Sequence, residues 1–560
     1  MRPGRSTGSG GPFEDMIRVP GPKAVYRRLR SELQYLGPRA TVRQAAALRR
    51  CFRDRVTIPR AEEEIKRALA RREERFLDIV RTHVYGRPAN PYLILLNEAG
   101  CAFSDLESHV RRHGLETTLT RLAAEGVYLT AAEFKGKTDV VRGGRSFRVS
   151  PSDFARPDPA PGLMVESSGT SNAPLAGRVA LDWLSIWTFS KGIFLAAHDL
   201  LGSAHAVYDN ILPAPAATYS LFHNARLGIA TERWFAQRWP VDRPARDVRC
   251  LWSTALIVSM GKLFGAGFPR PELLPLREFQ PVLEWISARR RQGRRCCLDV
   301  TGSNAVRIAR LALEHGISLE GTTCILHGEP FTDAKREIIE RAGARCTTRY
   351  SFSIGMNTGH GCANAAHIDE IHVNQYMLAV IAHPRPLALD GPPIRPLLFT
   401  TLYPQAALMH LNVENGDYAT LEERACGCAL ERVGLTLHLH RVRSYEKFTA
   451  EGWTFFYGDL YEVLEKTLPS EFGGGPGHYQ LVEEEDENGQ TRLTMLVDPE
   501  VGPVDEEKLA ARVREEFLRG KLGDGSVARA WWHRGGTFRV KRQPPRPSSR
   551  GKILPLQIPR

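Results

Sequence analysis

The sequence lacks an uninterrupted apolar stretch of about 20 residues, which is the length that a membrane-spanning helix needs. Its longest apolar stretch, residues 184–201, is interrupted by Lys191 and His198 and therefore predicts a core helix. The first dozen residues are rich in Gly, Ser and Pro and contain no apolar segment typical of a signal peptide. We expect residues 1–23 to form a disordered tail, and the protein to be cytoplasmic with no membrane partner.

Cysteine is scarce, with 10 residues in a chain of 560, and no secretion signal accompanies them. This pattern favours reduced thiols over disulfides. The Lys and Arg residues behind the net charge of +13 are spread over the whole chain and intermixed with acidic residues. We therefore expect no nucleic-acid partner, and a basic surface that suits anionic substrates such as ATP and coenzyme A, or an acidic carrier protein.

The chain is longer than one hydrophobic core usually organises, so it predicts at least two units. Residues 24–81 have apolar positions at helical spacing. Segments between residues 296 and 352 alternate strand, helix, strand, helix, strand, which predicts an α/β fold with a parallel sheet covered by helices. From residue 445 onward, a helix near 458–467, strands at 478–485 and 492–498, and a helix at 505–519 predict a small separate α+β domain.

A hydroxyl-rich segment follows a predicted strand near residue 165. Backbone N–H groups in such a loop can bind phosphate, and hydroxyls add donors. The segment lacks the spacing of a Walker loop, and by itself it is also compatible with a polar surface loop. The residues that we expect to contact phosphate are Ser167, Ser168, Gly169, Thr170 and Ser171.

This segment resembles the phosphate-binding loop SSGTTGxPK of the adenylate-forming superfamily, and further motifs of that superfamily follow in the same order. Gly328, Glu329 and Pro330 resemble its GGEP turn, and Tyr350 and Ser351 begin a segment that stands in place of YGxTE. Asn415-Gly-Asp417 resembles its TGD motif, Arg441 to Ser444 its hinge, and Arg550-Gly-Lys552 its C-terminal lysine motif. The segments LFTTL at residues 398–402 and NVENGDYATLEERACGC at 412–428 are most similar to phenylacetate-CoA ligases and the acyl-protein synthetases of bacterial bioluminescence.

The resemblance implies ATP-dependent activation of a small carboxylic acid to an acyl-AMP, followed by transfer to the thiol of coenzyme A or a carrier protein, with Mg²⁺ as cofactor. It implies a large AMP-binding domain over residues 24–440, of which 24–150 form a mostly helical entry region. A hinge at 441–444 that includes Arg443, and a mobile domain at 445–560, complete the expected organisation. Residues 328–330, Tyr350 and Ser351 would contact adenine, Asp417 and Arg441 the ribose, and Lys552 would be the catalytic lysine.

Two positions depart from the superfamily pattern. Ile354 stands where the superfamily has a Glu that binds Mg²⁺, and Leu175, Ala176 and Gly177 follow Pro174 where a Lys is usual. Mg²⁺ keeps several waters and binds substrate phosphates, so one missing carboxylate need not abolish its binding. Two alternatives therefore stay open: a catalytically degenerate nucleotide-binding or scaffold protein, and an adenylating enzyme that acts on a protein or a nitrogen nucleophile.

Cysteine and histidine residues gather between positions 362 and 428. Cys362, His372, Cys426 and Cys428 could supply a structural zinc site with N and S ligands, or they could be unligated thiols. By resemblance, His372 fits better than His367. The acyl pocket is expected to lie around residues 219–224 and Trp234, whose aromatic rings suit an aromatic or medium-sized apolar acid, although the same rings also suit ordinary core packing. The sequence does not indicate the oligomeric state.

Overall fold

The computed structural model describes residues 38–560 except 157–159, 167–175, 237–243, 266, 275–277, 329–330, 332, 353–355, 385–394, 445–448, 451–452, 455–462, 476–477, 486–490, 522–537, 547–555 and 558–560. The expected tail at 1–23 lies outside these residues. No helix in the described ranges combines the length and the apolar character needed to cross a bilayer.

The chain begins with a group of helices, as the periodicity of its first segment predicts. Helix α3 starts after Thr57, whose side chain accepts a hydrogen bond from the Arg60 backbone N–H, and it buries Ala61, Ile65 and Ala68 at helical spacing. The helices of this region are α2 (Pro38–Arg53), α3 (Ile58–Ala70), α4 (Arg72–Val80), η2 (Arg81–Tyr85), α5 (Pro91–Glu98), α6 (Phe103–His113), α7 (Leu115–Ala124), α8 (Ala131–Phe134) and η3 (Pro151–Phe154). Two antiparallel hairpins accompany them, β1 (Val140–Arg142) with β2 (Arg145–Phe147) and β3 (Gly162–Glu166) with β4 (Ala176–Ala180).

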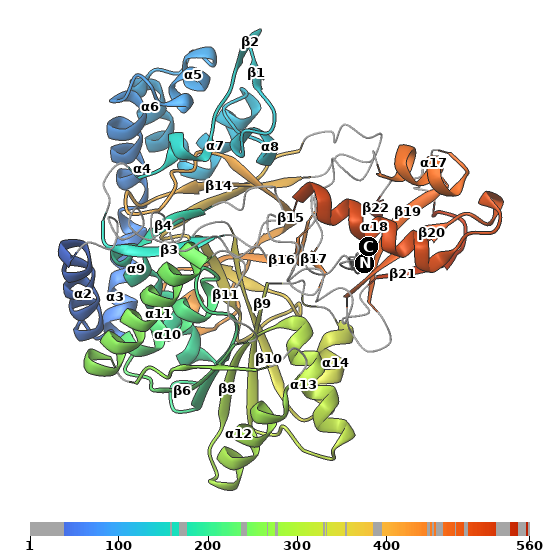
Figure 1. Ribbon diagram of the computed structural model, residues 1–560. Helices are drawn as coiled ribbons and strands as arrows, with labels where there is room; N and C mark the ends of the chain where they lie inside the picture. The colour runs from blue at the N-terminus through green and yellow to red at the C-terminus, as the bar shows by residue number, and fades with distance from the viewer. Residues whose placement is uncertain are drawn as a thin grey trace, which may run out of the picture.

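A 12-stranded sheet forms the centre of the molecule, in the order β13-β14-β15-β16-β12-β11-β10-β9-β8-β5-β6-β7 (Figure 1). One half is parallel and consists of β5 (Ala204–Tyr208), β6 (Thr231–Ala236), β7 (Pro271–Leu273), β8 (Cys296–Thr301), β9 (Thr322–His327) and β10 (Arg345–Phe352). The other half is antiparallel and consists of β11 (Met356–Gly361), β12 (Ile371–Val373), β13 (Leu378–Ala382), β14 (Pro396–Thr401), β15 (Val413–Glu423) and β16 (Leu437–Ser444). Strand β10 joins the halves, since it pairs parallel with β9 and antiparallel with β11.

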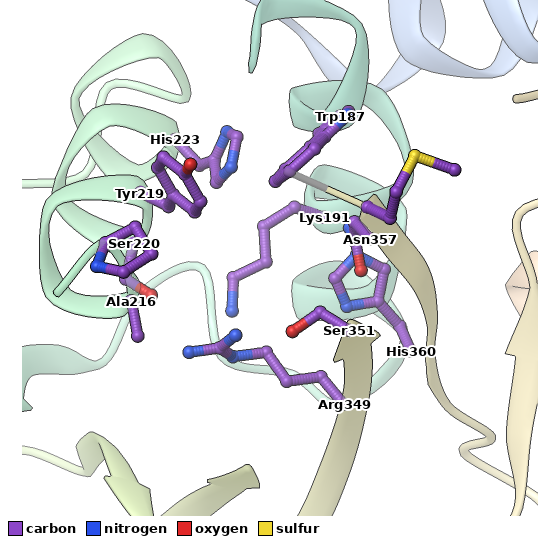
Figure 2. A pocket seen from close by; sticks show the side chains of 12 residues that line it. Trp187, Lys191, Ala216, Tyr219, Ser220, His223, Arg349, Ser351, Asn357 and His360 are labelled. Atoms are coloured by element: carbon purple, nitrogen blue, oxygen red, sulfur yellow. The ribbon is translucent and has the colours of Figure 1, made fainter. Parts of the chain in front are cut away.

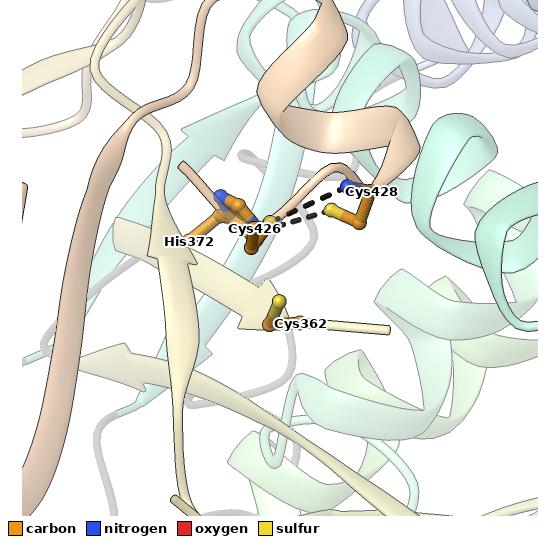
Figure 3. Close-up of side chains that lie close together, drawn as sticks. All are labelled: Cys362, His372, Cys426 and Cys428. Carbon is orange, nitrogen blue, oxygen red and sulfur yellow. Dashed lines mark hydrogen bonds between the residues drawn. The ribbon is translucent and has the colours of Figure 1, made fainter. Parts of the chain in front are cut away.

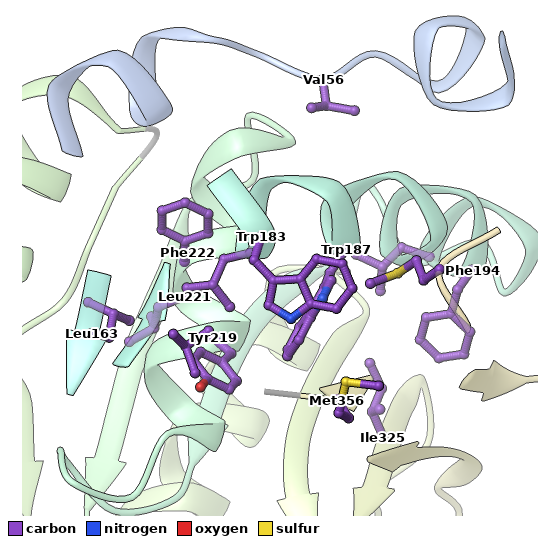
Figure 4. Close-up of a cluster of buried hydrophobic side chains, with 14 of the residues drawn as sticks. Val56, Leu163, Trp183, Trp187, Phe194, Tyr219, Leu221, Phe222, Ile325 and Met356 are labelled. Atoms are coloured by element: carbon purple, nitrogen blue, oxygen red, sulfur yellow. The ribbon is translucent and has the colours of Figure 1, made fainter. Parts of the chain in front are cut away.

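Successive side chains of the parallel strands point to opposite faces of the sheet and enter two different cores. Helices cover both faces and complete these cores. One core contains Val207, Cys297 and Ile325 together with helices α9 (Leu181–Ala197), α10 (Ala216–Arg226) and α11 (Pro244–Phe264). Figure 4 shows its aromatic centre around Trp183, Trp187 and Phe222. The other core contains Tyr208, Leu298 and Leu326 together with α12 (Gln280–Arg291), α13 (Gly302–Glu314) and α14 (Asp333–Arg341). The predicted α/β class and the alternation of strands and helices between residues 296 and 352 are thus confirmed.

The last part of the described chain has a sheet and a hydrophobic core of its own, and it lies beside the large sheet (Figure 1). Its four strands, in the order β21-β20-β19-β22, are β19 (Tyr479–Glu485), β20 (Thr491–Val497), β21 (Phe538–Arg542) and β22 (Leu556–Gln557). Its helical segments are η4 (Val463–Thr467), α17 (Leu468–Phe472), η5 (Pro499–Val501) and α18 (Glu506–Lys521). Three short elements precede this unit in the chain, namely helix α15 (Ala429–Arg432) and the hairpin of β17 (Thr449–Ala450) with β18 (Trp453–Thr454). The strands expected at 478–485 and 492–498 and the helix expected at 505–519 are present. Of the helix expected near 458–467, residues 458–462 lie outside the described residues.

Candidate functional site

Tyr350 and Asp417, which the sequence assigned to one nucleotide site, are in direct contact. The Tyr350 hydroxyl donates a hydrogen bond of 2.5 Å to Asp417 Oδ2. The Asn415 amide donates to the same carboxylate oxygen at 2.8 Å and to the Tyr350 hydroxyl at 2.6 Å. Burial and the neighbouring Asp417 carboxylate raise the pKa of Tyr350 well above its usual range, so the Tyr350 hydroxyl keeps its proton. We call Tyr350, Asn415 and Asp417 the triad.

The structure places only part of the predicted nucleotide site. Residues 167–171, Glu329, Pro330 and Lys552 lie outside the described residues, but the ends of the hydroxyl-rich loop are fixed because Glu166 pairs with Ala176 across the β3–β4 hairpin. Gly328 follows β9 with a left-handed backbone (φ 80°), and Ser351 follows Tyr350 in β10. Among the described residues of this set, Gly328, Tyr350 and Ser351 lie at or just beyond the carboxyl ends of the parallel strands β9 and β10.

The proposed hinge residues lie in β16, beside Asp417. Asp417 pairs with Ser444 and Tyr418 with Arg443, and the register shifts between Tyr418 and Thr420. Arg441 stands opposite this irregularity with a left-handed backbone (φ 56°), which is costly for a residue with a Cβ. Its side chain is exposed.

A buried network of charges lies behind the triad, on the other face of β10. Asp299 of β8 accepts hydrogen bonds from Arg349 at 2.9 Å and from the Ser220 hydroxyl at 2.8 Å. The Lys191 ammonium lies 3.6 Å from Asp299, and His327 Nε2 lies 3.1 Å from it. The side chains of Lys191, Asp299 and Arg349 are all about nine-tenths buried or more.

The protonation of this network follows from burial and mutual attraction. Burial by itself raises the pKa of Asp299, but Arg349, His327 and Lys191 outweigh it and hold the pKa well below its usual range, so Asp299 is ionised. Burial lowers the pKa of Lys191, and Asp299 opposes that shift. Burial also lowers the pKa of His223 and His360 well below the usual value, so both rings are neutral.

Lys191 and Arg349 face a cavity between α9, α10 and the strands β10 and β11 (Figure 2). Its lining residues are Trp187, Lys191, Pro215, Ala216, Tyr219, Ser220, His223, Arg349, Ser351, Met356, Asn357 and His360. The expectation that residues 219–224 surround a pocket is therefore met by Tyr219, Ser220 and His223. Trp234 does not line this cavity, because its indole N–H donates to the Asp209 carbonyl within the core.

Lys191, Asp299 and Arg349 were not among the site residues expected from the sequence. For two of them, the sequence contains a pattern that indicates a buried charge. Lys191 interrupts an otherwise apolar segment, and Asp299 stands inside the apolar strand CLDVTG. A charged residue within a buried element requires a partner of opposite charge, and these two residues are each other's partners.

The cysteine and histidine residues selected from the sequence come together on the antiparallel half of the sheet (Figure 3). One ligand atom from each of Cys362, His372, Cys426 and Cys428 lies within 4.8 Å of all the others. His372 Nε2 lies 3.0 Å from Cys428 Sγ and 3.5 Å from Cys426 Sγ. The preference for His372 over His367 agrees with this geometry, because His367 stacks instead on His440 with 3.8 Å between the ring centroids.

The surroundings of this cluster suit a metal ion with soft ligands. His372 Nδ1 donates at 2.6 Å to the Leu435 carbonyl, which leaves Nε2 as the ring atom that faces the thiols. Hydrogen bonding from Cys362 and the nearby His372 lower the pKa of Cys428, and so favour the thiolate that binds zinc. Three sulfurs and one imidazole nitrogen form a donor set that is frequent in structural zinc sites.

No protein-family model matches the sequence, and no curated protein matches it. Several solved structures are similar to it. A 2-hydroxyisobutyryl-CoA ligase in complex with 2-HIB-AMP and CoA has 14% sequence identity and a TM-score of 0.49, and covers 89% of this chain and 90% of its own. An amide bond synthetase from Marinactinospora thermotolerans has 11% identity over 86% of this chain and 97% of its own, with a TM-score of 0.37. An anthranilate CoA ligase in complex with anthranoyl-AMP has 11% identity over 70% of this chain and 65% of its own, with a TM-score of 0.30.

Proposed function

We propose that the protein activates a carboxylic acid with ATP, forms an acyl-AMP and passes the acyl group to a thiol. The observation that carries the proposal is the arrangement around β10. Tyr350 binds the acidic residue Asp417 on one side of this strand, and its neighbour Arg349 lines a buried cavity on the other. Adjacent strand residues point to opposite faces, so one strand would separate a nucleotide from an acid.

The triad of Tyr350, Asn415 and Asp417 suits the sugar of a nucleotide. The Asp417 carboxylate has the acceptor oxygens that ribose hydroxyls require, and Asn415 holds it in place at 2.8 Å. The Tyr350 ring offers a flat surface for adenine. We propose that Arg441 of β16 contacts the ribose from the neighbouring strand, and that the loop of residues 167–171 binds the phosphates.

Attack of a carboxylate on the α-phosphate requires that the two reactants are aligned and that negative charge is stabilised. In this proposal Lys552 supplies a cation at the reacting centre, and ATP supplies the leaving pyrophosphate. Mg²⁺ would bind mainly through the phosphates and water, since position 354 carries an Ile. Residues 441–444 would be the hinge between a domain at 24–440 and a domain at 445–560, so that Lys552 withdraws when the thiol arrives.

We also propose that Cys362, His372, Cys426 and Cys428 hold one structural zinc ion. Zinc bound there would tie β12 to the segment that precedes α15. Its role would be to stabilise the antiparallel half of the sheet, because all four positions of a tetrahedral site would be occupied by protein ligands. No step of the reaction passes through it.

The test is carboxylate-dependent exchange of pyrophosphate into ATP with a panel of acids. We expect exchange by the wild-type protein and a loss of about 100-fold or more in the Lys552→Ala variant, which removes a cation from the reacting centre. Lys508→Ala, which changes an exposed lysine of α18, is the matched control and should retain exchange. Nucleotide binding without exchange by any acid would favour a scaffold protein, whereas exchange without thioester formation would favour an amine or protein acceptor.

A further inference from the structure

The cavity between α9 and α10 contains more hydrogen-bond donors than the protein itself satisfies. Among the described residues, Trp187 Nε1, Tyr219 Oη, Arg349 Nε and His360 Nδ1 are buried and have no hydrogen-bond partner. All four belong to residues that line this one cavity (Figure 2). The Trp187, Tyr219 and His360 side chains are at most 7% exposed, so leaving their polar atoms without a partner is costly.

The four unpartnered groups have one chemical property in common, since each can donate a hydrogen. Trp187 Nε1 and Arg349 Nε carry hydrogens and never accept. The His360 ring is neutral, and its Nε2 is 3.1 Å from the Asn357 amide nitrogen, which leaves the hydrogen on Nδ1. The Tyr219 hydroxyl can also donate. A ligand in this cavity must therefore present several acceptor oxygens.

The charges of the cavity also select an anion. Lys191 and Arg349 are cations and Asp299 is the anion that faces both of them, at 3.6 Å and 2.9 Å. The second carboxyl group nearby belongs to Asp209, whose Oδ2 lies 3.5 Å from His327 Nε2. Burial raises the pKa of Asp209, which favours its neutral form. One further negative charge in the cavity would balance the two cations.

We infer that the acid which this protein activates carries a second carboxylate, and that Lys191, Arg349, Tyr219 and Trp187 bind that carboxylate. This inference rests on the proposed adenylation and specifies its substrate class as dicarboxylic acids. The apolar part of the lining, Pro215, Ala216 and Met356, would contact the carbon chain between the two carboxylates. A plain aryl acid, which the aromatic residues alone suggested, has a single carboxylate, and the proposed adenylation directs that carboxylate to the α-phosphate of ATP, so the donors and one cation of the cavity would have no partner.

The test compares binding of acids matched in length, without ATP, by isothermal titration calorimetry on the full chain. Glutarate and adipate are paired with valerate and hexanoate, and homophthalate with phenylacetate. We expect at least one dicarboxylate to bind tenfold or more tightly than its monocarboxylate partner. Equal or weaker binding of every dicarboxylate would overturn the inference and would show that water alone satisfies the donors.

Tyr219→Phe is the decisive variant, because it removes a hydroxyl that makes no hydrogen bond within the described protein and should not disturb folding. A hydrogen bond to a charged group is stronger than one between neutral groups, so this variant should lower the affinity for the dicarboxylate about tenfold and leave that of the monocarboxylate unchanged. Lys191→Met should lower the affinity for the dicarboxylate by a larger factor, because it removes a cation. Tyr92→Phe, which changes a buried tyrosine of α5 that belongs to another core and does not line the cavity, is the control.

Pyrophosphate exchange separates this inference from the proposed function. Dicarboxylate binding that is lost in Tyr219→Phe, together with no exchange by any acid, would support the cavity and contradict adenylation. Exchange with monocarboxylates only would support adenylation and overturn the inference. An unaltered dicarboxylate affinity in both Tyr219→Phe and Lys191→Met would overturn it as well.

Discussion

The Tyr350 hydroxyl and the Asp417 carboxylate are joined by a 2.5 Å hydrogen bond, although 67 positions separate them in the chain. The bond spans the junction between the parallel and antiparallel halves of the sheet, from β10 to β15. The Asp417 carboxylate is thus held in place through one oxygen, Oδ2, by the Tyr350 hydroxyl and the Asn415 amide.

Removal of the Asp417 carboxylate should therefore weaken nucleotide binding selectively. We expect Asp417→Ala to raise the KM for ATP in the exchange reaction about 10- to 100-fold, which is the loss of one or two hydrogen bonds to a charged acceptor. The measurement is the ATP dependence of exchange at saturating acid. Glu423→Gln, at the exposed end of the same strand, should leave the KM unchanged, and an unchanged KM in Asp417→Ala would refute the assignment.

Neutralising Asp299 should destabilise the part of the protein that contains the 12-stranded sheet. Asp299→Asn keeps the size of the side chain but leaves Lys191 and Arg349 buried without an anion, which costs about 3–5 kcal/mol when a buried pair is broken. Urea denaturation followed by tryptophan fluorescence measures the change. The exposed pair of Glu320 and Arg290 offers a contrast, since Glu320→Gln should change the unfolding free energy by at most about 1 kcal/mol. Equal effects of both substitutions would show that the Asp299 network does not stabilise the fold.

The purified protein should contain about one zinc ion per chain, and that ion should depend on the four ligands. We expect His372→Ala and Cys428→Ser to lose the metal and to unfold at lower temperature, as measured by plasma emission spectrometry and differential scanning calorimetry. Cys101→Ser changes a half-buried cysteine remote from the cluster and should retain zinc. A wild-type protein without zinc after expression in zinc-supplemented medium would end the proposal.

The C-terminal unit should lose stability in acid because of Glu484. Partial burial by itself raises the pKa of Glu484, but hydrogen bonds from Arg539, Arg546 and Lys541 outweigh it and lower the pKa to about 2 from the ordinary 4.5. A folded pKa below the unfolded value gives stability that is fully present above pH 4.5 and is lost as the pH falls toward 2.

Hydrogen exchange of peptides from β19 and β20 in the full chain, between pH 5 and pH 2.5, should therefore show increasing opening after correction for the intrinsic exchange rate. In Glu484→Gln this dependence on pH should be weaker. Glu507→Gln, at an exposed position of α18, should behave as the wild type. An identical pH dependence in Glu484→Gln would exclude Glu484 as its cause.

The part of the parallel half between residues 296 and 352 could be predicted from the sequence, because its strands are short apolar segments separated by amphipathic helices, as in β8, α13 and β9. Local patterns of this kind require no knowledge of distant contacts. The antiparallel half was not predicted, since strands such as MNTGHG in β11 contain glycine and polar residues that become buried only through pairing. The partners of Asp299 were also missed, because Arg349 and Ser220 lie 50 and 79 positions away and only the folded sheet brings them together.

The residues on the two sides of β10 can be changed separately in protein engineering. Arg349 and Tyr350 are neighbours in the chain, yet they contact different partners, Asp299 and Asp417. A library of variants at positions 187, 191, 219 and 349 should therefore alter the choice of acid and leave the affinity for the nucleotide intact. Under the proposed function, the geometry of one strand would allow the choice of acid to be redesigned independently of ATP binding.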